Sequence, residues 1–213
     1  MLASRLLTAT PFVQFNVKSL PDPEISTSGP SLVILIVAVP LNTCDDESLK
    51  RSVKRAIDKG ISCVTACGNN GDNNANTDEL NYPSYYNECI SVGSVRYSKS
   101  KSKFSASNKE IDLVCFGEGF NNRGVLSCYP GGLYQELKGS SMACPFVTGA
   151  LALLKNWFRT EFGREPSESE LYSQLIKRTY NLGLPKTLQG NGLLYLGIDT
   201  EINLFEIIEE LKI

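Results

Sequence analysis

A serine lies just ahead of a long apolar stretch in the segment GSSMACPFVTGALALLKNWF, residues 139–158. Glycine and proline around Ser141 predict a sharp turn into a helix. There the hydroxyl would lie at the positive end of the helix dipole, where a developing negative charge is stabilised. This is the chemistry of nucleophilic catalysis, in which a serine needs an adjacent base. The 213 residues contain no histidine, so the usual base for such a serine is not encoded here.

The same segment, G-S-S-M-A-C-P-F-V-T-G, resembles the nucleophile signature of subtilisin-like serine peptidases, G-T-S-M-A-x-P-H-V-A-G. The resemblance implies that Ser141 is the nucleophile. TACGNNG (65–71) is similar to the family's A-A-G-N-x-G, which implies that Asn69 donates its side-chain amide to the oxyanion. The matching positions around the serine are Gly139, Ser141, Met142, Ala143, Pro145, Val147 and Gly149.

Three further stretches extend the resemblance to about residues 32–198. YPSYYNECISVGSV (82–95) is similar to Y-P-A-x-Y-x-x-V-I-A-V-G-A-V, and FSASNKEIDLVCFG (104–117) to F-S-x-x-G-x-x-I-D-x-x-A-P-G. GVLSCYPGGLYQELKGSSMA (124–143) resembles the family's approach to its nucleophile, S-T-x-P-G-x-x-Y-x-x-x-x-G-T-S-M-A. The resemblance implies a serine endopeptidase that hydrolyses peptide bonds through an acyl-enzyme on Ser141.

The departures from the family concern the rest of the catalytic triad. Subtilisins carry it in chain order Asp, His, Ser, yet the residues before 32 contain nothing like D-T-G or H-G-T-H. The segment expected to read S-L-G-G, which holds the substrate backbone, reads VAVP (37–40), and Phe146 stands where the signature has His. We therefore expect the chain alone to be inactive, with an amino-terminal peptidase half supplied upstream or by another polypeptide.

Other roles for the chain stay open. One alternative is a non-catalytic pseudopeptidase that acts as a binding or regulatory protein, so its partner would be a polypeptide substrate or another protein. Another is a decaying gene product that no longer folds stably, because an unpaired apolar strand edge favours aggregation.

Several other residues could contribute chemistry but are better explained structurally. Lys138 could act as base in a serine–lysine dyad, although its neighbourhood indicates a solvated surface lysine. Asp58, Asp72 and Asp112 lack an imidazole to orient, and Cys144 is interpreted as a small packing residue. The loop NNGDNNANTDE (69–79) is rich in oxygen ligands and could hold calcium, but it has no EF-hand spacing. We expect no cofactor and no metal site.

The elements that must position Ser141 and Asn69 follow from the hydrophobic pattern. LVILIVAV (32–39), ISCVTAC (61–67), CISVGSV (89–95) and IDLVCF (111–116) predict buried strands of a parallel sheet. The fold class is α/β, a three-layer α/β/α domain with a mainly parallel sheet, reduced at its amino-terminal side.

Helices are expected over about 47–59, 142–159 and 167–180, with a last amphipathic helix from about Asn203, and GVLSCY (124–129) begins a hairpin. Apolar residues all round the stretch 142–159 predict a central, buried helix. Ser167 and Glu170 have the spacing of a capping box, which predicts the start of the helix that follows.

Composition limits the remaining possibilities. We expect residues 1–31 to form a divergent segment and linker, and residues 32–213 a partial peptidase domain. A net charge of -2 and the scattered Lys and Arg disfavour nucleic acid as a partner. No stretch has the length of a membrane span and residues 1–17 make a poor signal peptide, so we expect a soluble protein of undetermined compartment. The seven cysteines form no C-x-x-C pair and are interpreted mainly as buried thiols.

Overall fold

The structure is a computed structural model that describes residues 34–37 and 44–197. Three sequence predictions fall outside these residues: the segment 1–31, the VAVP stretch beyond Val37, and the helix from about Asn203. Within the described part, strand β1 (Ile34–Val37) lies inside the predicted strand 32–39.

The centre of the fold is a six-stranded sheet with the strand order β1-β2-β3-β4-β8-β7. Strands β1 to β4 and β8 run parallel, and β7 pairs with β8 antiparallel. The bounds are β2 (Ser62–Ala66), β3 (Ile90–Arg96), β4 (Leu113–Glu118), β7 (Thr179–Tyr180) and β8 (Leu193–Leu194). The three predicted strands 61–67, 89–95 and 111–116 are therefore confirmed, and the prediction of a mainly parallel sheet holds.

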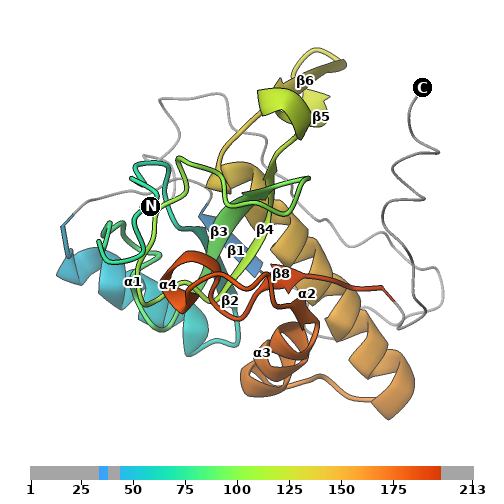
Figure 1. Ribbon diagram of the computed structural model, residues 1–213. Helices are drawn as coiled ribbons and strands as arrows, with labels where there is room; N and C mark the ends of the chain where they lie inside the picture. The colour runs from blue at the N-terminus through green and yellow to red at the C-terminus, as the bar shows by residue number, and fades with distance from the viewer. Residues whose placement is uncertain (1–33, 38–43, 198–213) are drawn as a thin grey trace.

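Helices cover both faces of this sheet, which confirms the three-layer architecture (Figure 1). Successive side chains of β2 point to opposite faces of the sheet. Cys63 packs under α1 (Glu47–Ile57), whereas Val64 packs in the core under α2 (Ser140–Phe162). The α2 side holds the larger core, to which α3 (Glu168–Lys177) contributes Leu171 and Leu175. The short helix α4 (Lys186–Gln189) and a 3-10 turn, Phe120–Asn122, complete the helical elements of the described residues.

The helix boundaries follow from local capping. The Asp46 carboxylate accepts hydrogen bonds from the amides of Ser48 and Leu49, so α1 begins at Glu47. At α3 the predicted capping box is confirmed: Ser167 accepts from the Glu170 amide, and the Glu170 carboxylate accepts from the Ser167 amide.

We predict that Glu170→Gln destabilises the protein at neutral pH and less so in acid. Arg164 and the Ser167 cap lower the pKa of Glu170 to about 2. Because the folded pKa is below the usual value, the ionised carboxylate stabilises the fold above about pH 4.5, and this contribution is lost as the pH falls towards 2. Urea denaturation of both proteins between pH 7 and pH 3 should show a gap that narrows with acidity. A gap independent of pH would contradict this assignment.

A β-hairpin precedes α2 and projects from the rest of the domain (Figure 1). It pairs β5 (Val125–Tyr129) with β6 (Leu133–Leu137) antiparallel, as the sequence predicted from GVLSCY. Leu126, Leu133 and Tyr134 on this hairpin are largely exposed. The chain leaves β6 only two residues before α2 begins, so the hairpin leads directly into the turn that carries Ser141.

All seven cysteines lie in the described residues and are free thiols. Five of them are buried, which confirms their interpretation as packing residues, and two, Cys44 and Cys128, are exposed. Among the described helices, none is long and apolar enough to cross a bilayer.

Candidate active site

Asn69 and Ser140 are joined by a compact set of hydrogen bonds that we call the clamp. The backbone amide of Ser140 donates to Oδ1 of Asn69 at 2.8 Å, and the Ser140 hydroxyl lies 3.0 Å from the same oxygen. The Gly68 amide donates to the Ser140 hydroxyl at 3.2 Å. Because an N–H needs an acceptor, the side-chain atom of Asn69 that faces Ser140 must be the oxygen. Nδ2 of Asn69 is the donor that the resemblance assigns to an oxyanion.

The clamp requires glycine on both sides. Gly68 has a φ of +113°, and a Cβ there would lie 2.3 Å from Nδ2 of Asn81. Gly139 has a φ of +154°, and its Cβ would lie 3.0 Å from Nδ2 of Asn69. A side chain at Gly68 would collide with Asn81, and one at Gly139 would press on the Asn69 side chain, so the backbone conformation and the close contacts both favour glycine.

Ser141 is the second residue of α2 and is half-buried, directly after the clamp residue Ser140. The structure thus places it at a helix amino terminus, as the sequence predicted, where the helix dipole favours negative charge. The clamp also ties the start of α2 to the loop that follows β2, so Ser141 and Asn69 are held at the same edge of the sheet.

A buried asparagine that sequence reasoning missed supports the Asn69 loop from behind. Asn81 is 2% exposed, and its Nδ2 donates to the Cys67 carbonyl at 2.9 Å and to Oδ1 of Asn70 at 2.8 Å. It therefore connects the two residues on either side of the Gly68–Asn69 pair. No local pattern marks Asn81, because its partner Cys67 lies 14 residues away.

We predict that Asn81→Ala destabilises the fold by about 1–3 kcal/mol, because it leaves the buried Cys67 carbonyl without the Asn81 donor. Urea denaturation monitored by circular dichroism measures this change. Asn76→Ala, an exposed asparagine of the same loop, is the matched control and should change stability by less than about 0.5 kcal/mol. Equal effects of the two variants would show that Asn81 does not brace the loop.

The lysine alternative gains no support from the geometry. Lys138 is exposed, and its Nζ donates to Oδ1 of Asn122 at 2.8 Å. The buried lysine of this region is instead Lys101, whose pKa is lowered by burial. Its Nζ donates to the Ser105 carbonyl at 2.5 Å. Both ammonium groups are therefore hydrogen-bonded away from the Ser140–Asn69 clamp.

The carboxylates named from the sequence lie in structural roles. Asp58 is the cap residue at the carboxyl end of α1, where its backbone amide donates to the carbonyls of Lys54 and Ala56. Asp72 accepts from the amide of Asn74 and the hydroxyl of Thr77. In the same loop, Glu79 accepts from the amide and hydroxyl of Ser107. Protein donors thus occupy these oxygens of the candidate calcium loop. In the described residues no group of three or more His, Cys, Asp or Glu side chains converges as metal ligands.

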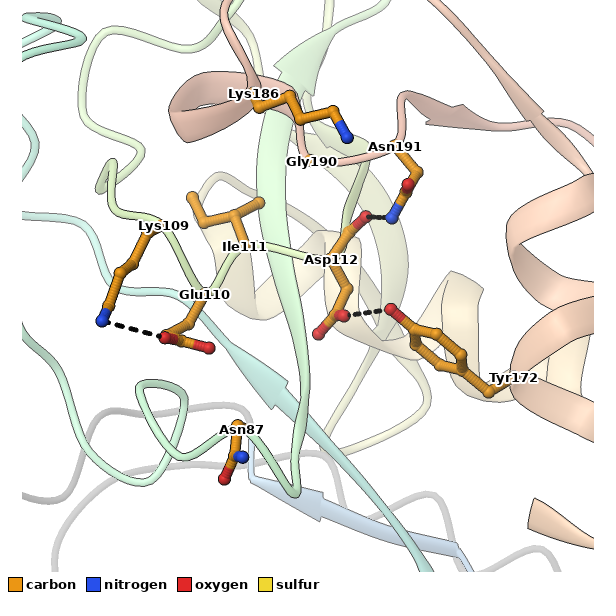
Figure 2. Close-up of a pocket in the computed structure, with 9 residues that line it drawn as sticks. All are labelled: Asn87, Lys109, Glu110, Ile111, Asp112, Tyr172, Lys186, Gly190 and Asn191. Carbon is orange, nitrogen blue, oxygen red and sulfur yellow. Dashed lines mark hydrogen bonds and ion pairs between the residues drawn. The ribbon is translucent and has the colours of Figure 1, made fainter. Parts of the chain in front are cut away.

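Asp112 lines a polar pocket of about 210 Å³ at the opposite edge of the sheet (Figure 2). It directly precedes β4, whereas Asn69 follows the carboxyl end of β2, and parallel strands place these ends on opposite edges. Its carboxylate accepts from the Tyr172 hydroxyl at 2.5 Å and from the Ser91 amide at 2.7 Å. Burial raises the pKa of Asp112. This carboxylate therefore supports the α3 contact and does not belong to the Ser141 site.

Cys144 lies one turn after Ser141 but is fully buried in the core under α2. Burial raises the pKa of its thiol, so the reactive thiolate is disfavoured. This agrees with its interpretation as a packing residue.

A parallel α/β sheet with a serine in the first turn of a helix, and an asparagine that follows a strand and is hydrogen-bonded to the start of that helix, is compatible with a serine hydrolase. The model of the subtilase family matches residues 40–193. The chain therefore belongs to the subtilase family of serine proteases.

Curated relatives agree with this assignment. The chain is 49% identical over 158 residues to the major intracellular serine protease of Bacillus subtilis (strain 168), a match that covers 74% of this chain and 48% of the relative. It is 46% identical over 169 residues to an intracellular serine protease of Paenibacillus polymyxa, covering 79% and 50% respectively. Subtilisin DY of Bacillus licheniformis is 34% identical over 136 residues, with coverage of 64% and 46%. The chain spans about half the length of the curated relatives it matches.

Proposed function

We propose that this chain provides the nucleophile and the oxyanion site of a subtilisin-like serine endopeptidase, with the general base supplied by polypeptide outside these 213 residues. The observation that supports the proposal is the clamp, in which Oδ1 of Asn69 accepts from the backbone amide of Ser140, the residue before Ser141. The family membership and the names of the relatives support peptide bonds as the substrate.

In the proposed reaction, Oγ of Ser141 attacks the carbonyl carbon of the scissile peptide and its proton passes to the external base. The resulting oxyanion accepts hydrogen bonds from the Asn69 side-chain amide and from the backbone amide of Ser141. The base then donates the proton to the leaving amine, and an acyl-enzyme remains on Ser141. Water, deprotonated by the same base, releases the acid and restores the serine.

This chain does not contain the histidine that usually acts as general base for such a serine. The 213 residues contain no histidine, and the lysines near the site are engaged elsewhere. A serine without its base retains at most about 10³–10⁴-fold catalysis over water from the oxyanion site and binding. We therefore expect the isolated chain to be close to inert.

The proposal is tested by mixing the purified chain with the half of the Bacillus subtilis relative that lies outside the matched region. A fluorophosphonate probe, which reacts with activated serines, is added to the mixture and to the chain alone. We expect labelling of Ser141, located by mass spectrometry, in the mixture only. A mixture that forms a complex without labelling Ser141 would contradict the proposed peptidase function.

The second candidate is a pseudopeptidase that binds a protein partner without catalysis. The observation that favours it is the complete lack of histidine in the sequence. In that case the chain would form a stable complex whose affinity is unchanged by Ser141→Ala, and no condition would label the serine.

A further inference from the structure

Two cysteines that are distant in the sequence lie side by side in the sheet. Strands β2 and β3 are parallel neighbours (Figure 1), and Val64 of β2 pairs with Ile90 of β3. The residues directly before this pair are Cys63 and Cys89. Because the register of a parallel pair continues from one residue to the next, these two cysteines lie opposite each other. Both side chains are buried in the same core cluster under α1, with exposures of 1% and 5%.

The structure holds these two residues as free thiols that contact each other. Hydrogen bonding with the Cys63 thiol, followed by burial, raises the pKa of Cys89. The protonated thiol is therefore the resting form of Cys89 at neutral pH. Cys67, directly after the same strand, is engaged elsewhere, because its Sγ lies 3.4 Å from the Ser105 hydroxyl. The contact between Cys63 and Cys89 is thus a specific pair of thiols within the core.

The spacing of the two cysteines suits a disulfide. Neighbouring strands of a sheet lie about 4.7–4.9 Å apart, and the Cα atoms of a disulfide usually lie about 4.4–6.8 Å apart. The Cβ atoms of a disulfide come to about 3.8 Å, which is closer than the strand spacing. A link between Cys63 and Cys89 would therefore form after a small movement of β2 towards β3 and would be strained. Strained disulfides are the ones that reductants cleave readily.

Such a link would close a loop of the chain that contains part of the candidate site. Asn69 of the clamp and Asn81, which supports the Asn69 loop, both lie between the two cysteines in the sequence. The cysteines lie near the amino ends of β2 and β3, whereas the clamp follows the carboxyl end of β2. A disulfide restricts the segment that it closes, so this one would restrict the Asn69 loop without contacting the clamp.

We propose that Cys63 and Cys89 are a redox-modification site, at which hydrogen peroxide converts the two thiols into a reversible disulfide. The thiolate of Cys89, the more exposed of the two residues, attacks the peroxide and forms a sulfenic acid as one water leaves. The Cys63 thiol then attacks that sulfur, and the S–S bond forms as a second water leaves. Two thiols are oxidised and one peroxide is reduced to two waters. A dithiol reductant reverses the step by exchange, because its own thiols become a disulfide.

The test treats the folded chain of 213 residues with hydrogen peroxide, then alkylates the remaining thiols in denaturant and maps them by mass spectrometry. Trypsin releases residues 60–96 as one peptide, because this stretch has no Lys or Arg before its last residue. Cleavage after Glu79 then leaves Cys63 and Cys67 on one part and Cys89 on the other. We expect the two parts to stay joined after peroxide, with Cys67 alkylated, and to separate after treatment with dithiothreitol.

Single substitutions assign the link. Cys63→Ala and Cys89→Ala should each abolish the joined product, whereas Cys67→Ala, the matched control on the same peptide, should leave it unchanged. Recovery of Cys63 and Cys89 as alkylated thiols after full oxidation of the exposed Cys44 and Cys128 would overturn the proposal. A product that forms only in denaturant would overturn it as well, because the folded chain would not make the link.

This inference is independent of the proposed peptidase function, because the reaction involves only two thiols of this chain. Labelling of Ser141 by fluorophosphonate tests the peptidase function, and the joined peptides test the redox site. Either result can therefore fail while the other holds.

Discussion

Replacing Ser141 by alanine should lower peptide hydrolysis by the reconstituted peptidase about a millionfold in kcat, which is the loss known for a subtilisin without its serine. The physical reason is that no acyl-enzyme forms without the hydroxyl, so only the oxyanion site and substrate binding remain. Hydrolysis of a chromogenic peptide by the mixture of this chain with the complementary half of the Bacillus subtilis relative provides the measurement.

The control for Ser141→Ala is Ser127→Ala, an exposed serine on the hairpin. Ser127→Ala should leave kcat within about twofold of the unsubstituted chain. Ser127 lies away from the clamp, and surface substitutions of this kind usually have small effects. Calorimetric binding of the complementary half should be equal for both variants, which separates loss of chemistry from loss of assembly. Retention of more than about one hundredth of the activity by Ser141→Ala would show that another residue is the nucleophile.

Removing the amide donor of Asn69 should cost about 10²–10³ in kcat, which is the range known for a subtilisin that lost one oxyanion donor. Two replacements separate the two functions of the side chain. Asn69→Asp keeps an oxygen for the Ser140 amide and hydroxyl but removes the donor, whereas Asn69→Leu removes both. We expect both to lose activity to this extent with little change in KM, since the donor acts on the charge that develops in the transition state.

Asn69→Asp also adds a negative charge beside the oxyanion, so its loss should be at least as large as that of Asn69→Leu. Asn76→Leu, an exposed asparagine in the following loop, is the control and should leave kcat unchanged. If Asn69→Asp kept activity within about tenfold of wild type, Asn69 would act through the clamp only and the proposed donor role would be wrong.

The sequence was sufficient for the parts of the fold that depend on local pattern. The predicted capping box at Ser167 and Glu170 is present, and the apolar runs became strands of the parallel sheet. These elements can be predicted from the sequence because a helix cap or a buried strand depends on residues that are only a few positions apart. The two-residue strands β7 and β8 were not predicted, since so short a run carries no periodicity.

The candidate site was only partly predictable. The signature placed Ser141 and Asn69, and the structure brings their loops together through Ser140. The sequence analysis missed the clamp, although a hydroxyl residue directly before the proposed nucleophile, Ser140 before Ser141, was a usable signal. Asn81 gave no signal, because its contacts join loops that are distant in the sequence. Similarly, the all-round apolar pattern of α2 predicted burial but could not indicate which face this chain covers by itself.

Every hydrogen bond of the clamp joins groups that belong to this one chain. The clamp is therefore formed within this chain, and under the proposed function no folding of the loop around Ser141 would have to follow the encounter with a partner. After mixing, labelling of Ser141 would then follow a single kinetic phase whose rate is proportional to the concentration of the partner, because no slower conformational step follows binding.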